Sequence, residues 1–161
     1  MAATVLQTIL STIETKLAAI LVASGYQTTV VSVSQIDDPP QLKTDATKYP
    51  YIWFGNMLVK SDTSDMDANL HHTDEEVALD LHLEVAYTTA ALARPAILDL
   101  YSDVKKALHA TWNMGLTAVK ETSTDALHVG TIQGAESGFV SGICTFRFSY
   151  RHVYGVPTTG A

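Results

Sequence analysis

Apolar residues near the start of the chain recur every three or four positions, the spacing of one face of an α-helix. The residues that share this face are Leu6, Ile9, Leu10, Ile13, Leu17, Ile20 and Leu21. Polar residues such as Gln7 and Glu14 occupy the other side, and Gly25 is a suitable helix stop. The pattern predicts an amphipathic helix over residues 3–23 that packs against a core.

Strand patterns follow this helix. β-branched or aromatic runs predict strands at residues 28–36 and 50–55, and one or two short extended pieces within 116–133. The clearest alternation covers residues 77–87, where one face is apolar and consists of Val77, Leu79, Leu81, Leu83, Val85 and Tyr87. A long strand at 142–154 alternates as well, with Cys144, Phe146, Phe148 and Tyr150 on one face. Its other face is basic and that of 77–87 is acidic, so cross-strand ion pairs are expected if the two strands are neighbours.

A second helix is expected to open at Arg94-Pro95 and to close at Gly115. Its predicted core stripe is Ile97, Leu98, Tyr101, Val104, Leu108 and Trp112. The element order is then α-β-β-β-α-β-β. We expect one α+β domain over residues 1–161, with an antiparallel, possibly mixed, sheet of four to five strands and two helices on one face.

Residues 60–76 interrupt this pattern, because Met66 and Leu70 are the only large apolar residues there. The interpretation is a long hairpin excursion, and long loops in compact domains are usually functional or disordered. Its acidic and histidine residues are our first candidates for contact with a partner, with an ordinary solvated surface as the alternative. They are Asp62, Asp65, Asp67, His71, His72, Asp74 and Glu75.

Metal binding by this excursion is disfavoured. Asp65, Asp67, Asn69 and Glu76 have the spacing of a calcium loop, but Leu70 stands where the turn glycine belongs. Adjacent histidines on an extended chain point to opposite sides, so His71 and His72 are poorly placed to share one ion. We expect no metal and no cofactor.

Composition narrows the class of protein. The 161 residues carry a formal net charge of −7, which argues against a basic nucleic-acid-binding face. Charged residues make up 17%, against roughly 25% in an average soluble domain, and a surface so low in charge suits burial against other subunits. The single cysteine, Cys144, excludes an internal disulfide and is expected to be buried. Without a basic signal region or a membrane-length apolar segment, we expect a soluble protein of a reducing cytoplasm, or one released by lysis.

No catalytic motif is present in the sequence. Phosphate-binding glycine loops are absent, and the serine of the run Gly138–Gly142 falls one place late for a nucleophile elbow. His82 lies between Asp80 and Glu84 on the polar strand face, as on any half-exposed strand, so no enzyme is expected. These three residues, together with Arg147 and Arg151, are our second candidate surface, for contact between subunits or for the lining of a lumen.

The order of elements and two local runs resemble those of one protein family. The runs are Pro50-Tyr51-Ile52-Trp53-Phe54-Gly55 and the closing strand Phe146-Arg147-Phe148-Ser149-Tyr150-Arg151. Over nearly its whole length the chain resembles the tail terminator proteins of long-tailed bacteriophages, also called tail-completion or tail-to-head joining proteins.

The resemblance implies a structural virion protein, assembled in the host cytoplasm. Such proteins form a ring, typically a hexamer, that caps the head-proximal end of the tail tube, stops its polymerisation and offers a joining surface to the head connector. DNA passes through the hole without specific binding, and the net negative charge of this chain predicts a negative lumen. Two alternatives stay open: another neck or minor tail protein of the same architecture, or a small α+β ligand-binding or enzymatic domain.

Overall fold

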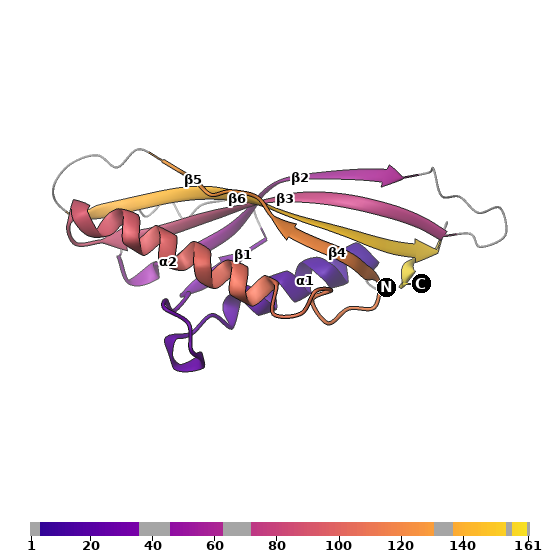
Figure 1. Ribbon diagram of the computed structural model, residues 1–161, viewed down its shortest axis with the longest axis horizontal. Helices are drawn as coiled ribbons and strands as arrows, with labels where there is room; N and C mark the ends of the chain where they lie inside the picture. The colour runs from indigo at the N-terminus through magenta and orange to yellow at the C-terminus, as the bar shows by residue number, and fades with distance from the viewer. Residues whose placement is uncertain (1–3, 36–45, 63–71, 131–136, 154–155, 161) are drawn as a thin grey trace.

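A computed structural model describes residues 4–35, 46–62, 72–130, 137–153 and 156–160. The fold is α+β, with two helices and a mostly antiparallel open sheet of seven strands (Figure 1). The helices are α1 (Val5–Ala18) and α2 (Ala90–Leu108). The strands are β1 (Ser32–Ser34), β2 (Tyr51–Asp62), β3 (His72–Tyr87), β4 (Val119–Thr124), β5 (His128–Val129), β6 (Gly138–Val153) and β7 (Val156–Gly160).

The sheet is built around β3 and β6, which pair antiparallel along their full lengths. The order across the sheet is β1-β2-β3-β6-β4, and β5 and β7 also pair with β6. Among the described strands only β1 and β2 run parallel, so the sheet is mixed. The central strands form a long twisted ribbon that extends past α2 at one end (Figure 1).

Helix α1 starts at a capping box. The Thr4 hydroxyl accepts the Gln7 N–H at 3.1 Å, and the Gln7 side chain accepts the Thr4 N–H at 2.8 Å. The helix ends at Ala18, before the expected end at residue 23, and a short 3-10 turn at Val22–Ser24 follows it. Most of the predicted core stripe is confirmed as buried or partly buried, whereas Leu21, beyond the helix, is exposed.

Helix α2 begins four residues earlier than expected, and Pro95 lies inside it rather than at its first turn. Thr89, in extended conformation, is the N-cap residue, and the alanine-rich run after it favours the helix. The predicted stripe is confirmed at Ile97, Val104 and Leu108, which are fully buried. It is wrong at Leu98 and at Trp112, which lies beyond the end of the helix and is 67% exposed.

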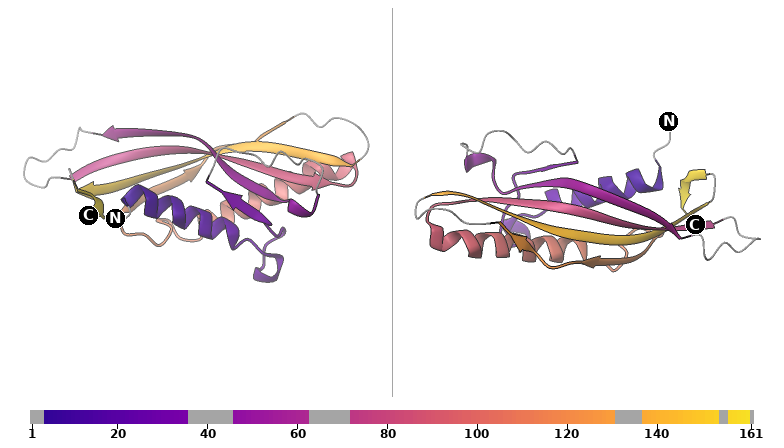
Figure 2. Two further views of the ribbon diagram at one scale, coloured as in Figure 1. Left: turned by 180° about the vertical axis from the view of Figure 1, so that it is seen from behind. Right: turned by 90° about the horizontal axis from the view of Figure 1, so that it is seen from above.

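Both helices lie on the same side of the sheet (Figure 2), and the main core fills the space between these layers. Asp103 of α2 is a buried polar residue, 2% exposed, and it links α2 to the segment that follows α1. Its carboxylate accepts the backbone N–H groups of Gln27 and Thr28 and the Thr28 hydroxyl, at 2.7–3.1 Å.

The strands are more numerous and longer than the four to five expected. Strand β2 continues through Asp62 and β3 starts at His72, so both ends of the expected excursion at 60–76 are paired strand. Similarly, β6 starts at Gly138, and β7 was not predicted at all. No helix among the described residues is long and apolar enough to span a membrane.

Candidate functional site: the outer face of the sheet and its edges

The face of the sheet opposite the two helices, here called the outer face, carries most of the polar residues singled out in the sequence. The predicted alternation of β3 is confirmed, because the odd-numbered residues from Val77 to Tyr87 are all buried. Asp80, His82 and Glu84 therefore point to the outer face, and the register of β6 adds Arg147 beside them.

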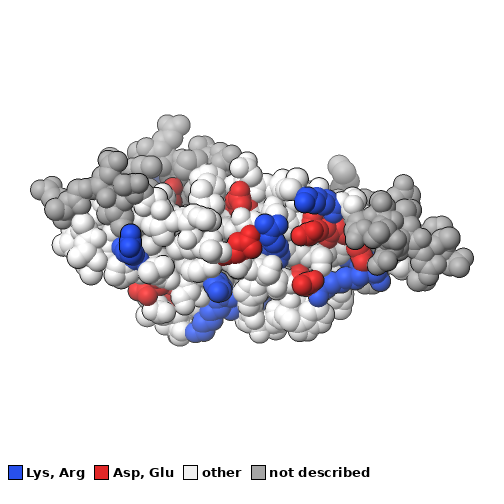
Figure 3. Space-filling view, turned by 45° about the horizontal axis from the view of Figure 1, so that its top comes forward, with Lys and Arg blue, Asp and Glu red and all other residues white. Residues whose placement is uncertain are grey.

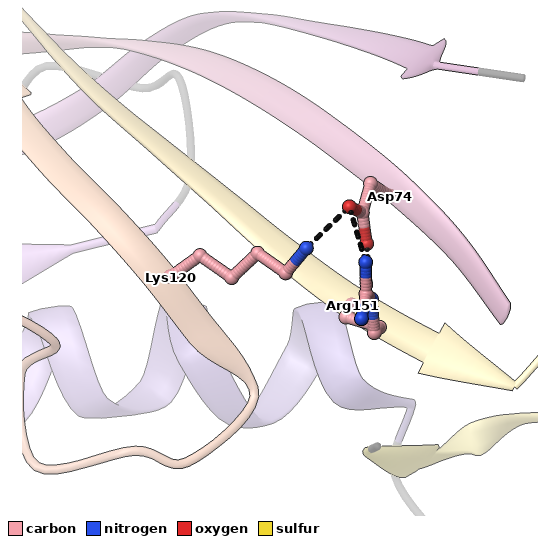
Figure 4. Close-up of polar contacts among 3 residues, drawn as sticks. All are labelled: Asp74, Lys120 and Arg151. Atoms are coloured by element: carbon pink, nitrogen blue, oxygen red, sulfur yellow. Dashed lines mark hydrogen bonds and ion pairs between the residues drawn. The ribbon is translucent and has the colours of Figure 1, made fainter. Parts of the chain in front are cut away.

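One ion-pair cluster joins three strands at the end of the outer face where β3 starts and β6 ends (Figure 4). Asp74 of β3 lies directly opposite Arg151 of β6, whose guanidinium donates to both carboxylate oxygens at 2.7 and 2.9 Å. Lys120 of β4 donates to the same carboxylate. These bonds, first that from Arg151, hold the pKa of Asp74 down to about 2, against the opposing effect of burial. Asp74 is thus ionised at neutral pH and its oxygens are occupied.

Glu75, the next residue of β3, points to the helix side instead. Its carboxylate accepts from the Tyr150 hydroxyl and lies 3.2 Å from His152 Nε2. Burial, and then the hydrogen bond to Glu75, raise the pKa of the Tyr150 hydroxyl above its ordinary value. The sequence grouped Asp74 and Glu75 on one loop surface, but the strand places them on opposite faces.

The middle of the outer face contains weaker polar contacts. Arg147 binds Asp125 at 3.0 Å, and both side chains are nearly half exposed. Asp80 accepts the Thr145 hydroxyl at 2.7 Å. The predicted strands are neighbours, but Asp80 and Glu84 lie opposite Thr145 and Ser141, and Arg147 lies opposite Ala78, so the ion pairs expected along residues 77–87 are not directly opposed. The directly opposed pair Asp74 and Arg151 lies in the part of β3 that was expected to be an excursion.

At the other end of the outer face, a second apolar cluster consists of Tyr49, Tyr51 and Trp53. The His82 ring stacks on Trp53 with 3.6 Å between ring centroids, and Glu84 is buried beside Tyr51 in the neighbouring strand. Burial, and then the charge of Glu84, raise the pKa of Tyr49. Two of the five candidate residues are thus packed against aromatic side chains.

Strand β2 carries an exposed apolar run that the sequence analysis passed over. Met57, Leu58 and Val59 are 43%, 55% and 38% exposed. Strand β1 pairs only with Tyr51–Trp53, so the later part of β2 forms an edge of the sheet within the described residues. The predicted strand ended at residue 55, but the apolar run was a signal for its continuation.

Two of the remaining candidates, Asp62 and His72, lie at the end of β2 and the start of β3. Asp65, Asp67 and His71 are outside the described residues. Asp62 is the last residue of β2 and pairs with Asp74, while His72 opens β3 opposite Val153. A polar groove of about 420 Å³ lies between β3, β6 and β4. Within the described parts of the chain, no group of three His, Cys, Asp or Glu side chains could hold a metal ion.

The only cysteine is buried, as the sequence predicted. Cys144 is 1% exposed on the core face of β6. Burial is the first cause that raises the pKa of its thiol to about 12. A thiol in this environment is a poor nucleophile.

No protein-family model matches this sequence, and no curated protein matches it significantly.

Proposed function

We propose that the chain is a structural subunit of a virion ring similar to the tail terminators of long-tailed bacteriophages. Copies of the chain would surround a hole at the head-proximal end of the tail tube, stop tube growth and offer a joining surface to the head connector. The resemblance in sequence supports this role. The structural observation that carries it is the exposed apolar edge of β2.

This edge favours assembly because it combines two features that monomers usually avoid. A free strand edge presents unpaired N–H and C=O groups that can template pairing with another chain. Here it also exposes apolar side chains to both faces, since Leu58 points outward and its neighbours Met57 and Val59 point to the helix side. Lys60 is the one basic residue in this run that would discourage pairing.

The described polar groups favour a structural role over catalysis. Asp74 is held ionised by two cations, Asp80 is bonded to a threonine, and the Cys144 thiol is buried with a raised pKa. None of these groups is arranged as a nucleophile beside a base, the arrangement on which covalent catalysis depends.

The outer face has the charge balance expected of a passage for DNA. Figure 3 shows acidic and basic side chains interspersed on the face that it presents. The charged residues described on this face include Lys60, Asp74, Glu76, Asp80, Glu84, Lys120, Glu121, Asp125, Arg147 and Arg151. A lumen lined by them would carry both signs and would therefore lack the clustered cations that retain phosphates. This refines the negative lumen expected from net charge alone.

The end of the β2–β3 hairpin remains our proposed contact with the tube or the connector. Its strands extend past α2, so the end of β2 and the start of β3 stand at one extremity of the described structure (Figure 1). Replacement of residues 63–71 by a two-residue turn is expected to leave self-association intact and to abolish joining. Joining at the normal rate by this variant would remove the hairpin end from the proposal.

The role itself is tested by polymerising purified tail tube subunits with and without the chain. Addition of substoichiometric protein is expected to shorten the tubes, and electron micrographs should show it at one tube end only. The capped tubes should then join to purified heads. Tubes of unchanged length, together with heads that fail to join, would overturn the proposal.

A further inference from the structure

Two free strand edges lie on opposite sides of the sheet, at the same position along the strand direction. On one side the edge is the later part of β2, residues 57–62, and on the other side it is β4, residues 119–124. The register places both beside the same stretch of the central strands, because β2 from Met57 to Asp62 pairs with β3 from Leu79 to Asp74. Both edges are six residues long, and within the described residues neither has a strand on its outer side.

The strand directions allow one copy to continue the sheet of another. At this level the sheet has four strands, β2-β3-β6-β4, and each neighbouring pair is antiparallel. With an even number of antiparallel strands, the two edge strands run in opposite directions. A second copy rotated about an axis along the strands therefore presents its β2 antiparallel to the first copy's β4.

One register matches both charge and side-chain direction. When Lys60 of one copy stands opposite Glu121 of the next, two exposed, oppositely charged residues on the outer face become a cross-strand pair. In the same register the four residues from Met57 to Lys60 each face a partner on their own side of the sheet, up to the irregularity of β4 between Val119 and Glu121. The other opposed pairs are Val59 with Thr122, Leu58 with Ser123, and Met57 with Thr124.

The exposed Trp112 completes the fit on the helix side. The Thr122 hydroxyl of β4 donates to the Trp112 carbonyl at 3.0 Å, which places this loop beside the β4 edge. Trp112 is 67% exposed. On the opposite edge of the molecule, Met57 and Val59 are 43% and 38% exposed. Edge pairing brings these apolar surfaces of two copies toward each other, and their burial stabilises the contact.

We propose that the β2 edge of one copy pairs antiparallel with the β4 edge of the next, with Lys60 opposite Glu121. This inference rests on the proposed function, because it supplies the contact between subunits of that ring. The contact is heterologous, so repetition closes a ring when the rotation between copies allows it. The helices cover one side of the sheet and lie on the outside of the ring, and the outer face, with Asp74, Arg147 and Arg151, lines the hole.

Disulfide trapping tests the register. Directly opposed residues on antiparallel strands have Cβ atoms about 4.5–5.5 Å apart, close to disulfide range, whereas diagonal neighbours are about 7–8 Å apart. Cys144 can stay in place because it is buried. A mixture of Lys60→Cys and Glu121→Cys copies is expected to form a disulfide-linked dimer under mild oxidation. The control mixture of Lys60→Cys with Ser123→Cys, displaced by two residues on the same strand, is expected to stay monomeric on a denaturing gel.

Charge reversal provides a second, independent measurement. Lys60→Glu alone places two acids opposite each other and is expected to weaken self-association roughly threefold. The double variant Lys60→Glu with Glu121→Lys restores the opposite signs and should recover the affinity. Lys60 also lies opposite Glu76 of its own β3, whereas Glu121 lies opposite Ser149. Glu121→Lys alone is therefore the matched single variant, because it opposes two lysines across the contact without opposing like charges directly within the subunit, and it should weaken self-association by a similar factor.

The outcomes separate this inference from the proposed function. Rings in electron micrographs without a Lys60→Cys to Glu121→Cys disulfide would overturn the edge contact and leave the ring standing. A disulfide between two Lys60→Cys copies would show β2 pairing with β2, and would overturn it as well. A trapped Lys60→Cys to Glu121→Cys dimer from protein that fails to cap tubes would support the contact and contradict the tail-terminator role.

Discussion

Replacement of Asp74 by asparagine removes the charge at the centre of the three-strand cluster while it keeps the shape of the side chain. Asp74 joins β3 to β6 through Arg151 and to β4 through Lys120 (Figure 4). The variant therefore measures how much this cluster stabilises the far half of the sheet.

The size of the effect follows from the pKa of Asp74. A decrease from 3.8 to about 2 corresponds to about 2.5 kcal/mol at roughly 1.4 kcal/mol per unit. The side chains of Arg151 and Lys120 are 34% and 40% exposed, so solvent and salt screen part of this attraction. We expect Asp74→Asn to lower the free energy of unfolding by about 1–1.5 kcal/mol at pH 7.

The pH dependence has a definite sign. Because the folded-state pKa is lowered, the stabilisation by Asp74 is complete above pH 4 and is lost as the pH falls from about 4 toward 2. Urea denaturation of both proteins at pH 7, 5, 4 and 3 should therefore give curves that converge in acid. Asp125→Asn is the matched control, because its ion pair with Arg147 is nearly half exposed and its loss should leave the midpoint unchanged. Equal effects of the two variants, or an Asp74→Asn effect independent of pH, would refute the reasoning.

Three further predictions concern the fold and its cysteine. Asp103→Ala leaves the N–H groups of Gln27 and Thr28 without their buried acceptor. It should lower the free energy of unfolding, measured by urea denaturation, by about 3 kcal/mol. An effect no larger than that of Asp99→Ala on the same helix would contradict this. Gly55→Ala would overlap the His82 ring stacked on Trp53 and should cost about 1–3 kcal/mol, but should cost little in a His82→Ala background; equal costs in both backgrounds would disprove the overlap. Burial raises the pKa of the Cys144 thiol to about 12, so Cys144 should resist a thiol reagent at pH 8 in the folded protein. In urea, where the thiol is exposed, it should react at once. Rapid labelling of the folded protein would show that Cys144 is accessible.

The sequence-based predictions of strand and helix faces were most accurate where burial alone determines the pattern of apolar residues. The alternation in β3 from Val77 to Tyr87 comes from burial against the helices, so period and face could be read directly. The Ile9, Ile13 and Leu17 stripe of α1 was clear for the same reason.

Element boundaries were harder, because tertiary contacts override local signals. Pro95 was interpreted as a helix start, yet α2 begins at Ala90 and accommodates the proline inside it. Trp112 was assigned to the core by spacing, but the helix ends at Leu108 and the periodicity no longer applies beyond it.

The candidate surface was predicted in part. The sequence placed Asp80, Arg147 and Arg151 on polar strand faces correctly. Asp74 was interpreted as loop, because a charged residue that is stabilised by partners distant in sequence has no local signature of a strand. The free edges at β2 and β4 depend on strand order, which the sequence leaves open.

We propose above all that copies of this chain surround a hole. Sedimentation velocity and negative-stain micrographs of the purified chain, examined across a range of concentrations, test it most directly. We expect a discrete closed oligomer with a central hole, whose association Lys60→Glu weakens and Lys60→Glu with Glu121→Lys restores. A monomer at every concentration, in the presence of tail tubes as well as in their absence, would contradict it.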